Sequence, residues 1–280
     1  MKPAIALTIA GSDSSGGAGI QADLATFSAC GVYGASVITA ITAQNTTGVR
    51  AVHAVPPDIV AAQIDAVLDD LAVGAVKIGM VYSAAIVAAI ASPLERRPSR
   101  PIVVDPVMIA TSGDRLIDDT AQASLIGRLF PLACCVTPNL AEAAALTQGA
   151  IAADEAEMER QARAILALGA AAVLIKGGHG RASESVDLLV TRDATQRFAT
   201  PRIATRNLHG TGCTLSSAIA AGLARGLELE AAVGVAKRYL WAAIRAGRDR
   251  AIGHGAGPVH HFHAFESVAS RTGANSGDGP

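Results

Sequence analysis

The chain has 280 residues; half are hydrophobic, 17% are charged and only 3% are aromatic. This length suits one large domain or two small ones, with a sizeable core. The formal net charge of −1 gives no electrostatic reason to expect nucleic acid or an acidic membrane as a partner, and few aromatic rings are available to stack on bases. We therefore expect neither partner.

The four cysteines, Cys30, Cys134, Cys135 and Cys213, form no C-x-x-C pair, so we expect neither structural zinc nor a disulfide framework. The first apolar stretch ends in a Gly/Ser-rich loop without a cleavage-type region. No apolar run of membrane-spanning length lacks charged or turn residues. These features predict a reduced, soluble, cytoplasmic protein.

Apolar runs of strand length alternate with helical stripes through the first half of the chain. The expected elements are a strand at 4–10, a helix with Ile20, Leu24 and Phe27 ending near Gly31, a strand at 35–43, a helix with Val60, Ile64, Val67, Leu68 and Leu71 that starts at Pro56 and Pro57, and a strand at 75–80.

The alternation continues in the second half. The expected elements are a strand at 102–105 ended by Pro106, a helix that includes 124–129, a strand at 133–137 ended by Pro138, a helix with Met158, Ala162, Ile165 and Leu166, a strand at 173–176, an edge hairpin of 186–190 with 196–203, and a helix at 230–248.

This order predicts an α/β fold with a mostly parallel sheet and helices on both faces. No composition break, internal repeat or long linker marks a second domain, so we expect one domain over 1–266. The small, polar residues 267–280 are expected to form a disordered tail.

Polar clusters follow most of the expected strands. They are Gly11-Ser12-Asp13, Gln44-Asn45-Thr46, Gly79-Met80, Asp105-Pro106, Asn139 with Glu142, and Lys176-Gly177-Gly178. Ligands in open α/β sheets bind beyond the carboxyl ends of the strands, so these clusters are expected to converge on one site.

The segment 209–220 places Gly210, Thr211 and Gly212 at the start of a helical stripe. The first N–H groups of a helix lack internal partners and carry partial positive charge, so such an end attracts phosphate. Cys213 stands there as a candidate reactive group. An ordinary glycine turn before a buried helix is the alternative.

The glycine-rich run 11–19 follows the first strand and precedes a helix. It imitates a dinucleotide fingerprint, but no acidic residue follows at the expected distance. A loop whose backbone approaches a small substrate fits better, and a plain loop is the alternative.

Three further positions allow two interpretations each. Asn139 and Glu142 share a face at a helix start and either hold magnesium through water or form a helix cap. Asp105 either binds a metal or anchors its turn. Lys176 either reaches phosphate oxygens or is solvated. The histidines at 254, 260, 261 and 263 are expected to pack at an edge rather than to bind a metal.

Taken together, these motifs resemble those of the hydroxymethylpyrimidine/phosphomethylpyrimidine kinases of thiamine biosynthesis, in the ribokinase superfamily. The resemblance covers about 8–265. Its most specific segments are 8–13, 15–23, 37–46, 104–108, Thr137-Pro138-Asn139-Leu140-x-Glu142, 176–179, 209–216 and 255–263.

The resemblance implies a three-layer α/β/α fold and two successive ATP-dependent phosphorylations, of 4-amino-5-hydroxymethyl-2-methylpyrimidine and then of its monophosphate. It implies ATP and Mg²⁺ as cofactors and a homodimer. No inserted strands are visible to build the lid of the sugar-kinase members, so a separate lid domain is not expected.

The resemblance also assigns residues. It places the aminopyrimidine at Gln44 and lines the pocket with Gly11, Asp23, Met80 and Val107. A carboxamide can pair with an amino group beside a ring nitrogen.

Lys176, Thr211 and Asn139 match nucleotide positions, while Asp105 and Glu142 match positions associated with magnesium. The backbone of 210–213 is expected to form an anion hole. Cys213 stands where many relatives carry a catalytic aspartate, and we expect the helix end to lower the pKa of its thiol.

Two other functions fit part of these observations. One is a kinase for pyridoxine, pyridoxal or pyridoxamine, which Gln44 and Cys213 disfavour. The other is a non-catalytic pyrimidine-binding regulatory protein, which would retain Gln44 but lose the anion hole, Lys176 or the magnesium carboxylates.

Overall fold

The computed structural model describes residues 2–98, 100–108, 117–178 and 183–265. The described strands form a nine-stranded sheet in the order β3-β2-β1-β4-β5-β6-β7-β8-β9. The strands are β1 (Ile5–Asp13), β2 (Tyr33–Asn45), β3 (Gly48–Ala54), β4 (Ala75–Ile78), β5 (Ile102–Val104), β6 (Cys135–Val136), β7 (Ala172–Lys176), β8 (Glu184–Thr191) and β9 (Thr195–Pro201).

Strands β2, β1, β4, β5, β6 and β7 run parallel, whereas β3, β8 and β9 pair antiparallel at the two edges. The expected largely parallel sheet and the edge hairpin of β8 and β9 are confirmed. Strand β3 is missing from the prediction. It lies at the sheet edge with several exposed side chains, so its apolar pattern is weak.

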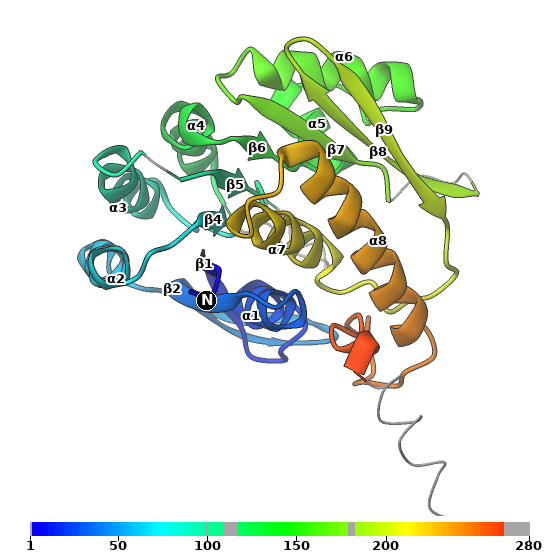
Figure 1. Ribbon diagram of the computed structural model, residues 1–280, viewed down its shortest axis with the longest axis horizontal. Helices are drawn as coiled ribbons and strands as arrows, with labels where there is room; N and C mark the ends of the chain where they lie inside the picture. The colour runs from blue at the N-terminus through cyan, green and yellow to red at the C-terminus, as the bar shows by residue number, and fades with distance from the viewer. Residues whose placement is uncertain (1, 99, 109–116, 179–182, 266–280) are drawn as a thin grey trace, which may run out of the picture.

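Two helical layers cover the sheet (Figure 1). One layer contains α2 (Pro57–Asp70), α3 (Ala84–Glu95), α4 (Asp119–Arg128), α5 (Leu140–Thr147) and α6 (Glu155–Leu166), with the short 3-10 helix η1 (Phe130–Leu132). The other contains α1 (Gly19–Ala29), α7 (Thr211–Ala224) and α8 (Leu229–Gly247). The three-layer arrangement is thus confirmed. Helix α3 was not predicted.

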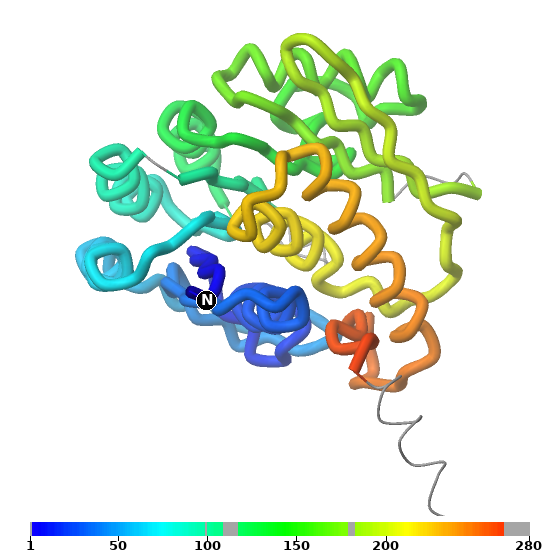
Figure 2. The backbone as a smooth tube through the Cα atoms, viewed as in Figure 1, coloured from blue at the N-terminus to red at the C-terminus, as the bar shows by residue number. Residues whose placement is uncertain are grey.

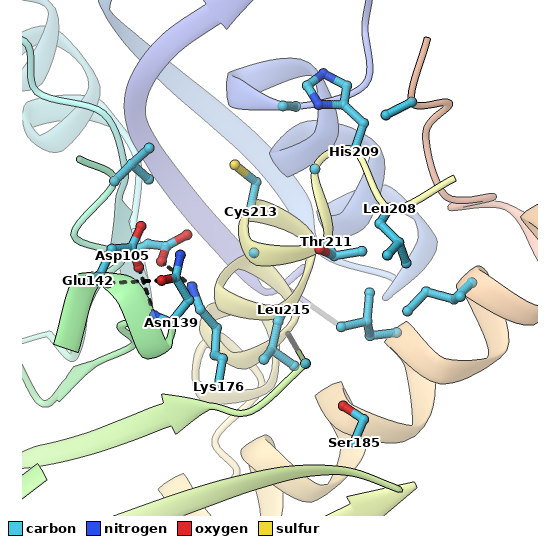
Figure 3. A pocket seen from close by; sticks show the side chains of 18 of the residues that line it. Asp105, Asn139, Glu142, Lys176, Ser185, Leu208, His209, Thr211, Cys213 and Leu215 are labelled. Atoms are coloured by element: carbon cyan, nitrogen blue, oxygen red, sulfur yellow. Dashed lines mark hydrogen bonds and ion pairs between the residues drawn. The ribbon is translucent and has the colours of Figure 1, made fainter. Parts of the chain in front are cut away.

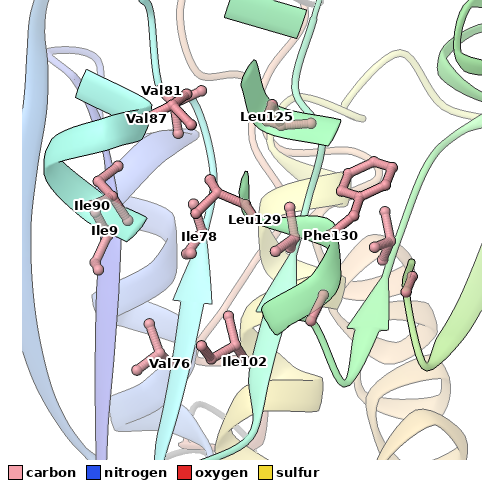
Figure 4. Close-up of a cluster of buried hydrophobic side chains, with 14 of the residues drawn as sticks. Ile9, Val76, Ile78, Val81, Val87, Ile90, Ile102, Leu125, Leu129 and Phe130 are labelled. Carbon is pink, nitrogen blue, oxygen red and sulfur yellow. The ribbon is translucent and has the colours of Figure 1, made fainter. Parts of the chain in front are cut away.

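Each layer has its own core because side chains alternate between the faces of a strand. On β4, Val76 and Ile78 belong to the core beneath α2–α6, while Ala75 belongs to the core beneath α1, α7 and α8. Figure 4 shows the first core, in which Ile78, Ile90 and Leu129 interdigitate and are fully buried. Both faces are covered, so the central strands read as continuous apolar runs.

The C-terminal segment returns to the N-terminal strands, as the tube in Figure 2 shows. The Ala256 amide donates to the Thr46 carbonyl at 3.0 Å, and the Gly255 amide donates to the Thr46 hydroxyl at 3.1 Å. The expected tail, 267–280, lies outside the described residues. No helix among the described residues is both long and apolar enough to span a membrane.

Candidate active site

A cavity of about 920 Å³ opens at the carboxyl ends of the parallel strands. Its inner end is lined by Gly11, Gln44, Met80 and Val107, and its outer end lies between the β8–β9 hairpin and α8. The N-terminus of α7 lies between these ends. The predicted polar clusters therefore do meet at one site, at the sheet edge where parallel strands end.

Helix α7 begins at a glycine because the turn before it demands one. Gly210 has a φ of 75°, and a Cβ there would overlap the Gly17 carbonyl oxygen. No side chain among the described residues caps this helix end. Thr211, Gly212 and Cys213 line the cavity, so the positive end of the helix faces it (Figure 3). The glycine turn and the helix start are both present, and the geometry suits an anion.

Lys176 and Asp105 lie beside this helix end. The Lys176 ammonium donates to Asp105 Oδ1 at 2.7 Å, and both side chains are almost completely buried. A Cβ added to Gly212 would lie 3.2 Å from Lys176 Nζ and 3.5 Å from Asp105 Oδ2. The ion pair is therefore in contact with the first turn of α7.

Further contacts hold the Asp105 carboxylate. It accepts from the Thr137 hydroxyl at 3.1 Å and from the Ser216 hydroxyl at 3.3 Å. Burial opposes its ionisation, but Lys176 and Lys77 outweigh burial and keep the pKa of Asp105 below its ordinary value. Lys176 is not solvated, and Asp105 is an ionised carboxylate at the cavity wall.

Asn139 and Glu142 form the helix cap that their spacing allows. The Asn139 side chain accepts from the Glu142 amide at 2.9 Å, and the Glu142 carboxylate accepts from the Asn139 amide at 2.7 Å. Burial raises the pKa of Glu142 to about 7; Lys176 opposes this shift and Asp105 adds to it. Both residues also line the cavity, so the cap does not exclude a role toward a ligand.

The pair Asp105 and Glu142 is suited to Mg²⁺. Magnesium in phosphate-binding sites takes one or two carboxylates, keeps several waters and uses phosphate oxygens for the rest. Two buried carboxylates lie on one cavity wall, and burial together with the Asp105 charge raises the pKa of Glu142, so a divalent cation between them would stabilise both ionised forms.

Cys213 differs from its prediction. Burial raises the pKa of the Cys213 thiol to about 11, and the nearby Lys77 ammonium only partly opposes this. The expectation that the helix end lowers this pKa is wrong, because the loss of water around the sulfur outweighs the favourable charges. At neutral pH the thiol is therefore protonated.

Asp23 also requires a correction. Its carboxylate is fully buried and bonded to the Lys77 ammonium at 2.8 Å, to the Thr8 hydroxyl at 2.6 Å and to the Ser217 hydroxyl at 2.7 Å. Asp23 is not among the residues that line the cavity, although Lys77 is. All its oxygens are used in binding neighbours within the core, so it supports the cavity floor from beneath.

The inner wall contains the other predicted substrate residues. A β-bulge between Ala43 and Gln44 interrupts the pairing of β2 with β3. A bulge re-aims the side chain that follows it, and the Gln44 side chain lines the cavity. Gly11 lies against Met80, whose terminal methyl carbon would be 3.3 Å from a Cβ at position 11.

Several cavity residues were not predicted individually. Asp13 and His209 form a buried pair at 2.8 Å next to Gln44. Asp187 and Lys237 form another, at 2.7 Å, in the outer part of the cavity. Asp13 and His209 lie in the segments 8–13 and 209–216, and their positions next to glycine-rich turns are the only sequence feature that indicates a place in the site. The pair of Lys237 with Asp187 could not be predicted, because Lys237 is a single polar residue on a helix and its distance along the sequence gives no indication that it meets a residue of strand β8.

The C-terminal histidines lie at the edge of the fold. His261 is buried, its Nε2 lies 3.1 Å from the Thr214 hydroxyl, and burial lowers its pKa to about 4. The His263 ring is 5.4 Å from the Tyr239 ring, measured between centroids. These contacts pack the returning segment onto α7 and α8.

Known proteins resemble this chain along most of its length. The family model described as phosphomethylpyrimidine kinase matches residues 13–260. A hydroxymethylpyrimidine/phosphomethylpyrimidine kinase of Rhizobium meliloti is 64% identical, covering 94% of this chain and 98% of the relative. The enzyme of that name from Escherichia coli is 52% identical, covering 95% of this chain and 100% of the relative.

Solved structures of kinases are also similar to this chain. An ADP complex of Bacillus subtilis pyridoxal kinase has a TM-score of 0.87 at 35% identity and covers 94% of this chain and 99% of that one. A phosphomethylpyrimidine kinase from Clostridium difficile has a TM-score of 0.76 at 48% identity, with coverages of 86% and 99%. The fold, the cavity and these similarities lead to one conclusion: the chain belongs to the phosphomethylpyrimidine kinase family.

Proposed function

We propose that this protein transfers phosphoryl groups from ATP, first to the hydroxymethyl group of 4-amino-5-hydroxymethyl-2-methylpyrimidine and then to the resulting monophosphate. One observation carries the proposal: the uncapped N-terminus of α7 lies against Lys176 in a cavity that has Gln44 on its inner wall. An anion site and a polar group that can read a heterocycle thus share one enclosed space. The relatives named hydroxymethylpyrimidine/phosphomethylpyrimidine kinase support this substrate.

The backbone of Gly212 and Cys213 carries out the electrostatic part of the reaction. Phosphoryl transfer depends mainly on positioning and on stabilising charge at the moving group. The Thr211 amide donates to the Leu208 carbonyl at 3.3 Å, so the next two amides of α7, those of Gly212 and Cys213, are the donors that bind the transferring group. Lys176 neutralises phosphate oxygens beside them, and Asn139 and Thr211 contact the same part of the nucleotide.

Asp105 and Glu142 would hold Mg²⁺ at this wall, and the ion would supply charge neutralisation of the ATP phosphates. Asp105 is ionised already. Glu142 must lose its proton to bind a cation, and its carboxylate remains oriented by the Asn139 amide. Lys176 keeps one Asp105 oxygen in place while leaving the other toward α7.

Cys213 lies in the first turn of α7, where it can accept the proton of the substrate hydroxyl. Only the thiolate can accept that proton, so the thiol must first release its own proton to solvent; because its pKa is about 11, a very small fraction of the molecules is in this form at neutral pH. The second step has less need of a base, since a phosphate monoester has its second pKa near 6 and is mostly dianionic at neutral pH.

Product analysis tests the proposal. ADP release is coupled to a spectrophotometric assay with the hydroxymethylpyrimidine, and the products are identified by mass. We expect a monophosphate that converts to a diphosphate. A protein that binds the pyrimidine without ATP turnover would contradict the proposal and favour a regulatory role.

Pyridoxal is assayed in parallel, because pyridoxal kinases have the same fold. A larger kcat/KM for pyridoxal than for the pyrimidine would contradict the assigned substrate.

The protein functions in the cytoplasm as a homodimer. Free thiols at all four cysteines suit a reducing compartment. Ile41 exposes about half of its side chain on β2, opposite His53 of the edge strand β3, and this edge of the sheet is a surface that a second copy can cover. Sedimentation equilibrium distinguishes a dimer from a monomer.

A further inference from the structure

The segment 202–208, which we call the lead-in segment, connects β9 to the turn that starts α7. Its residues form neither helix nor strand, and they run directly into the left-handed Gly210. Because no side chain among the described residues caps α7, the direction of its first amides depends on where the lead-in segment holds this turn. The contacts of the lead-in segment therefore determine how the anion site faces the cavity.

Asn207 is the most deeply buried residue of the lead-in segment, with only 5% of its surface exposed. Its neighbours Arg206 and Leu208 line the cavity, whereas Asn207 is not among the lining residues. A buried carboxamide has to find partners for its donors and its acceptor. The partners of Asn207 lie in two segments that are distant in the sequence.

The nitrogen of the Asn207 carboxamide binds the carboxyl end of α8. Its two N–H donors go to the carbonyls of Gly247 and Arg250, each at 2.8 Å, and the Arg248 carbonyl lies 3.3 Å from the same nitrogen. The last carbonyls of a helix lack partners within the helix, so they accept from outside it. Three acceptors around one atom identify it as the nitrogen and fix the orientation of the carboxamide.

The oxygen of the same carboxamide binds the returning C-terminal segment. Asn207 Oδ1 accepts from the Gly257 amide at 3.2 Å, and the Gly257 carbonyl accepts from the His209 amide at 3.1 Å. A Cβ at position 257 would lie 2.4 Å from Asn207 Oδ1. Gly257 is thus bound on both sides to the chain that leads into α7, at a distance that leaves no room for a side chain.

Thr205 adds a second contact between the lead-in segment and α8. Its hydroxyl donates to the Arg248 carbonyl at 2.9 Å and accepts from the Asn207 amide at 3.1 Å. One proton and one lone pair of the hydroxyl serve these two bonds, so they are compatible. Loss of the Asn207 carboxamide would nevertheless break the link among the lead-in segment, the end of α8 and Gly257 at once.

We propose that Asn207 is a positioning residue for phosphoryl transfer: its carboxamide fixes the lead-in segment and so holds the Gly212 and Cys213 amides in the direction that transfer requires. Asn207 does not line the cavity, so it acts through the α7 turn and touches no substrate. A displacement of about 1 Å at a reacting group costs on the order of 100-fold in rate, even when its cause is remote. The inference rests on the proposed function and adds to it a residue outside the cavity.

Kinetics and calorimetry of Asn207 variants test the inference. Asn207→Ala should lower kcat by about 10- to 100-fold and weaken the Kd of a non-hydrolysable ATP analogue by about tenfold. The Kd of the hydroxymethylpyrimidine, measured without nucleotide, should stay within about twofold, because the inner end of the cavity does not contact Asn207. Asn207→Asp retains the shape and the acceptor for Gly257 but presents an oxygen to the α8 carbonyls, so it should be no more active than Asn207→Ala.

Gln161→Ala provides a matched control for the loss of a buried carboxamide. Gln161 on α6 is 4% exposed, its Nε2 donates to the Ala150 carbonyl at 2.7 Å, and it does not line the cavity. Its substitution should lower the free energy of unfolding but leave kcat and the Kd of the ATP analogue within about twofold of the wild type.

A folded Asn207→Ala with kcat and analogue Kd within about twofold of the wild type would overturn the inference. So would a pyrimidine affinity that falls as far as kcat, or an equal loss of kcat in Gln161→Ala, since either result indicates general loosening. If the Asn207 variants do not fold, Thr205→Val decides: kcat should fall about threefold or more at an unchanged pyrimidine Kd, and an unchanged kcat would contradict the proposal.

Two readouts separate this inference from the proposed function. A wild type that binds the ATP analogue but does not phosphorylate the pyrimidine would contradict the proposed function. The affinity of Asn207→Ala for the analogue requires no turnover, so a weakened Kd would still support the positioning of the α7 turn and an unchanged Kd would refute it.

Discussion

Replacement of Glu142 by glutamine should stabilise the free protein at alkaline pH. Burial raises the pKa of this carboxyl from 4.5 to about 7, so its charged form is unfavourable in the folded state. The unfolded chain releases the proton near pH 4.5, and the folded chain keeps it until about pH 7. The wild type therefore loses stability as the pH rises through this interval, by an amount on the order of 3 kcal/mol.

Glutamine cannot ionise, and it serves at the third helical position of a capping box as well as glutamate does. Glu142→Gln should thus match the wild type near pH 4.5 and exceed its free energy of unfolding by up to about 3 kcal/mol at pH 8.5. Urea unfolding followed by the fluorescence of Trp241, the single tryptophan, measures this across the pH range.

Glu157→Gln provides a matched control. Glu157 occupies the third position of α6, where the side chain of the N-cap Asp154 accepts from its amide, but it is partly exposed and paired with Arg160. Its substitution should change stability by less than about 1 kcal/mol at every pH. If the wild type and Glu142→Gln lose stability in parallel between pH 4.5 and 8.5, Glu142 does not carry the buried charge and the reasoning is refuted.

The remaining predictions concern catalysis and the α7 turn. Cys213→Ala should slow the first phosphorylation more than the second, since only a hydroxyl needs a base; equal losses in kcat with the two substrates would argue against the base. Gln44→Ala should raise the KM for the pyrimidine about tenfold or more and leave that for ATP within about twofold; an unchanged pyrimidine KM would remove Gln44 from the site. Gly210→Ala should lower the free energy of unfolding by more than about 2 kcal/mol, because its backbone is left-handed and its Cβ meets the Gly17 carbonyl; thermal unfolding at wild-type temperature would contradict that.

Reactivity of Cys213 follows from its raised pKa. Iodoacetamide should label this thiol slowly at pH 7.5 and progressively faster toward pH 11, as the thiolate fraction grows. Mass spectrometry of labelled peptides locates the modification, and rapid labelling at pH 7.5 would show a thiolate that the buried site does not explain.

Much of the fold can be predicted from apolar patterning. The parallel core strands are covered on both faces, so they appear in the sequence as short continuous apolar runs ended by glycine or proline. Apolar patterning does not predict strand β3, because its side chains are largely exposed at a sheet edge. Its pairing with β2 is specified by the tight connection at 46–47 rather than by an apolar face.

The site is predictable to the extent that it lies at strand ends and one helix start. Lys176, Asp105 and the α7 turn meet because parallel strands place their carboxyl ends together. The direction of a side chain near this edge depends on its position around a helix or along a strand, which sequence spacing alone does not fix. Asp23, on α1, points into the core toward Lys77 rather than into the cavity. The raised pKa of Cys213 cannot be predicted from the sequence, because burial of a single sulfur is a property of three-dimensional packing that local sequence does not encode.

A crystal structure with a non-hydrolysable ATP analogue and the hydroxymethylpyrimidine tests the central claim most directly. We predict that the terminal phosphate accepts hydrogen bonds from the backbone amides of Gly212 and Cys213 beside Lys176, with the pyrimidine ring against Gln44. A triphosphate bound away from the start of α7, or a pyrimidine outside the inner end of the cavity, would contradict the account.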